Sequence, residues 1–271
     1  VQVFFYRGGR NYGNKAYYPS AGQGAETGEA LETFCAQFYS ERTPPRLVLL
    51  SEATPQQEVL EAALTSRAER RVRVLVPRRG AKRELVDHAR TNAEQALARR
   101  LAEGSAQRRQ LDALGEKLEL AEPPKRVEVY DNSHIQGRHA TGVFIVAGPD
   151  GFERQAYRTF NIKDAATAPG DDFAMMREVF RRRFHRLVKE DPERSSGAWP
   201  DLVLIDGGQG QLSAVAGVLN ELGIRDVPLV AVAKGPDRHA GREVLHRLDA
   251  APLQLGEREP VLYFIQRLRD E

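Results

Sequence analysis

Two apolar stretches of strand length limit the folds open to this chain of 271 residues: 201–206, Asp-Leu-Val-Leu-Ile-Asp, and 227–233, Val-Pro-Leu-Val-Ala-Val-Ala. A strand that is apolar on both faces has to be covered on both faces, which is typical of parallel sheets flanked by helices. A helical pattern follows the first stretch, and an amphipathic helix is expected over 260–269. The chain is therefore predicted to be an α/β protein.

Three earlier strand patterns complete the expected sheet. They cover residues 126–131, 137–147 and 153–162, and a helix pattern over 171–189 follows them. Three strands joined by turns, a helix, and two strands that alternate with helices indicate an RNase H-like mixed five-stranded sheet with flanking helices.

The segment Ala121-Glu122-Pro123-Pro124 marks a domain boundary, because proline cannot continue a helix and holds its predecessor in extended geometry. A long Ala- and Arg-rich helical pattern precedes it, with an expected interruption at Gly104-Ser105. We predict a smaller α/β domain over residues 1–122 and an RNase H-like domain over residues 123–271.

The first half has the same order of strands and helices as the second. Residues 46–51 stand where 201–206 stand, and Ser51 and Arg7 take the places of Asp206 and Asp131. We interpret residues 1–122 as a degenerate RNase H-like repeat without catalytic carboxylates. A generic α/β domain with the same alternation is the alternative.

Composition excludes several classes of protein. The single cysteine, Cys35, permits neither a disulfide within the chain nor a thiolate metal site. No apolar stretch approaches the length of a membrane span and no secretory signal is visible, so we expect a cytoplasmic protein with no membrane contact. Arginine makes up 33 of the 40 basic residues, and its planar fork suits phosphate, although GC-rich coding produces the same skew.

Two aspartates end apolar strands and carry the strongest chemical signal. Asp131 closes 126–131 and Asp206 closes 201–206. Side chains at the carboxyl ends of parallel strands project towards bound ligands, and two carboxylates that meet there repel each other unless a cation separates them. Mg²⁺ or Mn²⁺ is the natural occupant of such a site and can polarise a phosphodiester. For either aspartate alone, a turn or capping role is the alternative.

Two further residues are candidates at the same edge. In Gly170-Asp171-Asp172, Asp171 is expected to cap a helix, and Asp172 either complements the helix dipole or assists the metal site. Lys234 follows the strand at 227–233 and is a candidate for neutralising the scissile phosphate, with a solvated surface lysine as the alternative.

Arginines on the helix at 171–189 are candidates for DNA contacts, because phosphate contacts supply most non-specific affinity. We predict this role for Arg177, Arg181 and Arg182, and for Arg238 beyond Lys234. A solvated helix face is the alternative. Residues 207–210, Gly-Gly-Gln-Gly, lack both the P-loop ending and the dinucleotide spacing, so no nucleotide cofactor is expected, and we interpret these glycines as letting a nucleic-acid backbone approach the next helix.

Four segments together resemble the UvrC family of bacterial nucleotide excision repair nucleases. They are residues 123–134, 157–162, 170–177 and 201–211, and residues 1–14 are similar to the segment that precedes the nuclease domain of the family. The resemblance spans essentially the whole chain.

The resemblance implies a metal-dependent endonuclease domain that makes the 5′ incision beside a lesion in damaged double-stranded DNA delivered by UvrB, and indirectly by UvrA. It implies that Asp131 and Asp206 bind the metal and that Asp172 is a further important carboxylate. Asn132 departs from the apolar residue usual in the family, which we expect to be tolerated. The catalytic histidine of the family follows an Arg-Asp-Glu motif on which this chain ends, so we expect weak or no incision by this chain alone.

Two rival functions stay open at this stage. Endonuclease V shares an RNase H-like fold with strand-end aspartates and a later lysine, but lacks the Gly-Asp-Asp-Phe helix start found at residues 170–173. A DNA- or protein-binding scaffold without catalysis is the other alternative.

Overall fold

A computed structural model describes residues 1–19, 26–135, 138–162, 171–235 and 243–271, which form two compact units, Val1–Leu101 and Ala102–Glu271. The division lies inside helix α3 (Ala81–Lys117), earlier than the expected boundary at 122/123. The end of this helix belongs to the second unit, because Leu111, Leu114 and Leu118 pack into that core. No helix in the described part of the chain is both long and apolar enough to cross a membrane.

Helix α3 is continuous, so the interruption expected at Gly104-Ser105 is wrong. A mid-helix glycine costs only about 1 kcal/mol relative to alanine, and the burial of leucines further along the helix offsets this cost. The helix ends where the sequence analysis expects. Leu120 N bonds to Gly115 O, and a Cβ at Gly115 would lie 3.2 Å from Pro123 Cα, so the proline segment folds back against the helix.

The first unit contains two small sheets in its described residues. The hairpin of β1 (Gln2–Arg7) and β2 (Arg10–Ala16) is antiparallel, and β3 (Leu47–Leu49) and β4 (Arg73–Leu75) form a parallel pair. Helices α1 (Thr27–Phe38) and α2 (Gln57–Ala68) pack with them around one core. The order of strands and helices along the chain matches the expected repeat. However, these four strands form two separate sheets, whereas the strands of the second unit form one sheet. The interpretation as a degenerate repeat stays a prediction.

The second unit is built on one mixed sheet with the order β12-β11-β10-β9-β5-β6-β7, and β8 also pairs with β6. Its strands are β5 (Val127–Ile135), β6 (Arg138–Gly148), β7 (Gly151–Phe152), β8 (Arg158–Asn161), β9 (Leu202–Asp206), β10 (Leu229–Ala233), β11 (Val244–Arg247) and β12 (Leu253–Gln254). The RNase H-like α/β class is confirmed. The expected count of five strands is too low, because the short strands β7, β11 and β12 extend the sheet, and the strand expected over 153–162 is shortened to β8 by a helical turn at Arg154–Ala156.

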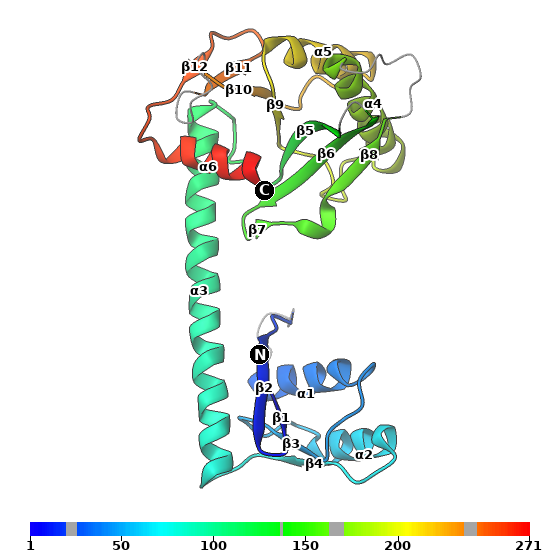
Figure 1. Cartoon of the computed structure of the whole chain (residues 1–271), viewed down its shortest axis with the longest axis vertical. Helices are drawn as coiled ribbons and strands as arrows, with labels where there is room; N and C mark the ends of the chain where they lie inside the picture. The colour runs from blue at the N-terminus through cyan, green and yellow to red at the C-terminus, as the bar shows by residue number, and fades with distance from the viewer. Residues whose placement is uncertain (20–25, 136–137, 163–170, 236–242) are drawn as a thin grey trace. The chain divides into compact units, whose positions relative to one another are not determined.

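Helices cover both faces of this sheet (Figure 1). On one face, α4 (Asp172–Glu190) and α5 (Gln209–Glu221) pack on alternate residues of β9, Val203 and Ile205. On the other face, α6 (Pro260–Asp270) and the end of α3 pack on Leu202 and Leu204. The apolar run thus supplies both cores, as the sequence predicts.

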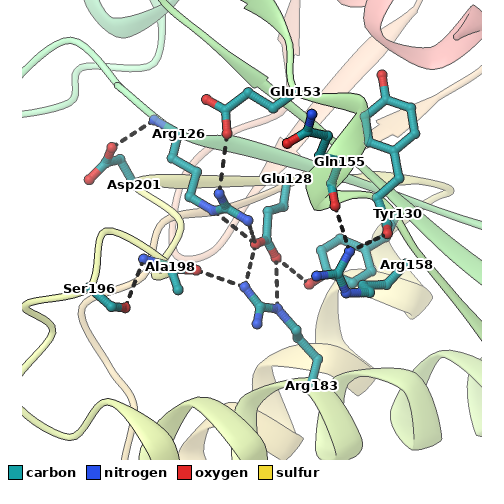
Figure 2. Close-up of polar contacts among 11 residues, drawn as sticks. Arg126, Glu128, Tyr130, Glu153, Gln155, Arg158, Arg183, Ser196, Ala198 and Asp201 are labelled. Atoms are coloured by element: carbon teal, nitrogen blue, oxygen red, sulfur yellow. Dashed lines mark hydrogen bonds and ion pairs between the residues drawn. The ribbon is translucent and has the colours of Figure 1, made fainter. Parts of the chain in front are cut away.

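A buried carboxylate ties β5 to α4. Figure 2 shows Glu128 between the guanidinium groups of Arg126 and Arg183, which donate to Glu128 Oε1 at 3.0 and 2.6 Å. Tyr130 Oη donates to Glu128 Oε2 at 2.6 Å, and Arg183 also reaches Ala198 O at 2.7 Å. Glu128 is fully buried. Arg183, which belongs to the basic run at 181–183, therefore lies inside the unit rather than on its surface.

Candidate functional site

The topology brings Asp131 and Asp206 to one end of the sheet. Strand β5 runs parallel to β9, and the last paired residues are Tyr130 and Ile205, so the two aspartates each lie one position further along neighbouring strands. Asp206 ends β9, but β5 continues past Asp131 to Ile135 because it stays paired with β6, so the prediction that a strand ends at Asp131 is wrong. Asp206 is in turn paired with Val232 on the next parallel strand, β10. Lys234 lies two residues beyond Val232, after β10 ends. Three residues predicted to share a site therefore meet at one edge.

The pKa of Asp131 reports this proximity. Burial raises the pKa of the Asp131 carboxyl, and the negative charge of Asp206 raises it further. A hydrogen bond from the Asn132 backbone and the positive charges of Lys234 and Arg269 act in the opposite direction. Since the net direction is upward, the ionised form of Asp131 is disfavoured here and would be stabilised by an added positive charge.

Arg269, near the end of α6, is a member of the site that sequence reasoning missed. Its Nη2 atom lies 2.5 Å from Asp206 Oδ1, and its side chain is only 8% exposed. Glu243 Oε1 lies 3.9 Å from Arg269 Nη1 and accepts a hydrogen bond from Gln266 at 2.8 Å. Asp206 is thus paired with an internal cation. The amphipathic pattern predicts the helix, but no local signal indicates its long-range partner.

The start of α4 lies beside the end of β5. Asn132 Nδ2 donates to the backbone oxygen of Asp172 at 3.2 Å, which connects the residue after Asp131 to the first residue of the helix. Asp171 caps the helix as expected, because its Oδ1 accepts from Ala174 N at 2.9 Å. The Asp172 side chain is exposed. Asn132, the departure from the usual family residue, therefore has a positioning contact of its own.

Two of the three glycines in the loop at 207–210 have roles inside the protein. A Cβ at Gly210 would lie 2.7 Å from the ring of Phe173, and one at Gly207 would overlap the Gln211 side chain. Gln211 Oε1 accepts from Gly208 N at 3.0 Å and so closes the start of α5. Packing of Phe173 from α4 explains Gly210, and the Gln211 side chain at the start of α5 explains Gly207.

Two of the arginines expected to contact DNA form contacts within the protein. Arg181 pairs with Glu221 at 3.0 Å, and Arg182 donates to Asn161 O at 2.8 Å and pairs with Glu178 at 3.1 Å. Arg177 lies half-buried on the same helix, and Arg238 lies outside the described residues. Their role in DNA binding stays a prediction.

The donors at this edge fit a hard divalent cation in chemistry. The negative charge of Asp206 disfavours the ionised form of Asp131, which a cation between the two carboxylates would relieve. Within the described residues, no group of three or more His, Cys, Asp or Glu side chains is close enough to hold a metal. An ion here would be held by Asp131 and Asp206, with the remaining ligands supplied by water or phosphate oxygens, as Mg²⁺ commonly accepts.

Comparison with known proteins gives consistent matches over the chain. A family model described as "UvrC RNAse H endonuclease domain" matches residues 115–271, and one described as "UvrC Ribonuclease H-like domain" matches residues 1–100. UvrABC system protein C of Cereibacter sphaeroides is 56% identical over the whole chain, which covers 44% of that relative, and the same protein of Paramagnetospirillum magneticum is 55% identical, with 43% covered. The chain therefore spans less than half the length of these curated relatives.

Solved structures match less closely. Human endonuclease V is 17% identical with a TM-score of 0.33, over 48% of this chain and 58% of that one. Argonaute of Marinitoga piezophila is 9% identical with a TM-score of 0.30, over 82% of this chain and 36% of that one.

Proposed function

The chain belongs to the UvrC family, and from this premise we propose that its second unit is a divalent-metal-dependent endonuclease that makes the 5′ incision beside a DNA lesion. The proposed setting is nucleotide excision repair in the cytoplasm. The substrate is damaged double-stranded DNA, and UvrB, with UvrA acting before it, is the proposed partner of the full-length protein.

One observation carries the proposal. Asp131 and Asp206 each lie one position past the last paired residues of the parallel strands β5 and β9, and burial together with the charge of Asp206 raises the pKa of Asp131. The ionised form of Asp131 is therefore disfavoured in the folded chain, and a bound Mg²⁺ or Mn²⁺ would relieve this cost.

Each residue at this edge has its own role in the proposed reaction. Asp131 and Asp206 would hold the ion, which when bound polarises the phosphodiester and lowers the pKa of a water molecule. Lys234 would neutralise charge on a phosphate at the same edge. Arg269 fixes the orientation of Asp206 through its 2.5 Å contact. Asn132 holds the start of α4, and with it Asp172, next to Asp131.

Metal binding by the chain itself gives the first test. We expect Mn²⁺, titrated into the 271-residue chain and followed by calorimetry, to bind at least about tenfold more weakly to Asp131→Asn and to Asp206→Asn. Asp150→Asn is the matched control, since Asp150 is an exposed carboxylate in the same unit, paired with Arg108. Equal Mn²⁺ affinity in all four proteins would remove the two aspartates from any metal site.

Incision is tested in a protein of the relatives' full length that carries this chain. On a duplex with one defined lesion, Asp206→Asn is expected to abolish the cut on the 5′ side and to leave circular dichroism unchanged. Cleavage beside a deaminated base, in a duplex with no other altered base, would favour endonuclease V-like activity instead. DNA binding that depends on neither Mn²⁺ nor Asp131, with no cleavage, would identify a scaffold.

A further inference from the structure

The hairpin β1–β2 in the first unit carries an unusual charge pattern. The sequence contains no Asp or Glu before Glu26, whereas Arg7, Arg10 and Lys15 all lie on or beside the hairpin. All three basic side chains belong to exposed residues. The hairpin thus presents positive charge without a local acid to neutralise it.

Exposed aromatic rings lie among these cations. Tyr12 is 63% exposed and Tyr6 39% exposed. The aromatic residues nearer the base of the hairpin have packing partners instead: Phe4 contacts His88 at 5.1 Å between ring centroids, and Tyr17 contacts Phe34 at 5.2 Å. The core therefore explains the rings at the base and does not explain Tyr12.

The turn of the hairpin is tight and open to solvent. Gly8 and Gly9 have φ of 53° and 75°, which only glycine adopts readily and which gives a two-residue turn matched to the twist of the strands. A Cβ built at either glycine would meet no atom within 4 Å. Arg7 and Arg10 pair directly across the strands, and the Arg7 guanidinium lies 5.9 Å from the centre of the Tyr12 ring.

We propose that the outer part of this hairpin, formed by Arg7, Arg10 and Tyr12, is a binding site for unpaired DNA. The two arginines neutralise phosphates, and a base stacks on the Tyr12 ring. Stacking on an exposed ring requires a base that is free of its duplex, which selects single-stranded over double-stranded DNA. This site lies in the other unit from the carboxylates and goes beyond the proposed nuclease function.

The chemistry favours nucleic acid over an acidic protein surface. Carboxylates on a protein would pair with the cations but would leave the tyrosine faces without a partner, whereas a single strand supplies phosphates and flat rings at regular intervals. Arg7 against Tyr12 also makes an internal cation–π contact. Because the Arg7 guanidinium lies over one face of the Tyr12 ring, a base would stack on the opposite face.

The test is fluorescence anisotropy of a labelled oligothymidine, with the full chain in EDTA so that no metal-dependent cleavage intervenes. Tyr12→Ala is expected to weaken binding at least about fivefold, and Tyr12→Phe to retain wild-type affinity, because stacking needs the ring and not the hydroxyl. Tyr263→Ala, which removes a ring that is 57% exposed on α6, is the matched control.

Salt dependence tests the phosphate contacts separately. Arg7→Gln with Arg10→Gln is expected to reduce the slope of log affinity against log salt by about 1.4, since each contact to a single strand contributes about 0.7. Tyr12→Ala binding within twofold of wild type, or equal affinity for a matched duplex, would overturn the proposal. The readout is independent of the carboxylates: Asp206→Asn is expected to bind the oligonucleotide normally, so loss of nuclease activity and loss of this site are separate results.

Discussion

Replacing Glu128 with glutamine is expected to lower the free energy of unfolding of the second unit by about 3–5 kcal/mol. The Glu128 carboxylate accepts from Arg126, Arg183 and Tyr130, and the exposed fractions of the two arginine side chains are only 15% and 13%. Glutamine keeps the shape of the side chain but removes the counter-charge of the nearly buried Arg183 guanidinium and leaves Arg126 with only the exposed Glu153 carboxylate at 3.6 Å. The loss is large beside a total stability of about 5–15 kcal/mol.

The only tryptophan gives a local reporter for this measurement. Trp199 lies in the core of the second unit, 9% exposed, and its Nε1 donates to Asp191 O at 2.8 Å. Urea unfolding followed by Trp199 fluorescence in the full chain therefore reports the unit that contains Glu128. Glu153→Gln is the matched control, because Glu153 contacts Arg126 at 3.6 Å but its side chain is 48% exposed. Its expected effect is within about 1 kcal/mol.

A double-mutant cycle separates the ion pair from simple loss of packing. Arg183→Met combined with Glu128→Gln is expected to cost less than the sum of the two single changes, because the double variant removes one of the uncompensated cations. If Glu128→Gln costs less than about 1 kcal/mol, or if the two changes add without coupling, the electrostatic account of this network is wrong.

Three further predictions follow from the same geometry. Asp131→Asn is expected to raise the urea midpoint at pH 7.5, because burial and the charge of Asp206 raise the pKa of this carboxyl and disfavour its charged form in the folded state. The difference in urea midpoint is expected to shrink as the pH falls and the wild-type carboxyl becomes protonated. A difference that stays constant at all pH values would contradict this prediction. Arg269→Met is expected to lower the free energy of unfolding by about 1.5–3 kcal/mol through loss of the Asp206 contact. The control Arg186→Met, at an exposed arginine, is expected to lower it by less than about 0.5 kcal/mol. Equal effects of the two substitutions would refute the prediction. Cys35 is 5% exposed, and burial together with the nearby Glu32 charge raises the pKa of its thiol to about 11. Iodoacetamide at pH 8 is therefore expected to label Cys35 only after unfolding. Rapid labelling of the native chain would disprove this.

The architecture of the second unit could be predicted because its signals are local. A run such as residues 201–206 is apolar on both faces, and only a sheet with helices on both sides buries it, as Leu204 and Ile205 in opposite cores illustrate. The helix cap at Asp171 could also be predicted, because it depends on a single hydrogen bond between its side chain and a backbone N–H three residues later. The strand-end position of Asp206 follows from the same pattern, whereas β5 continues past Asp131 to Ile135.

The misplaced features depend on contacts that a local pattern does not contain. Gly104 is a helix breaker by propensity, yet α3 continues through it because leucines further along the helix are buried in a distant core. Strands β11 and β12 are short, and β11 pairs antiparallel with β10 only once the parallel sheet provides an edge.

By itself, the sequence determined the α/β class, the strand-helix order of the second unit, and one acid on each of two apolar strands, because periodicity, capping and proline geometry act within a few residues. Only the tertiary structure decided that Arg269 pairs with Asp206 and that Glu128 is enclosed by Arg126 and Arg183. Those pairings join groups far apart along the chain or hidden by burial, and their strength comes from the removal of water around them, which happens only when the whole unit packs.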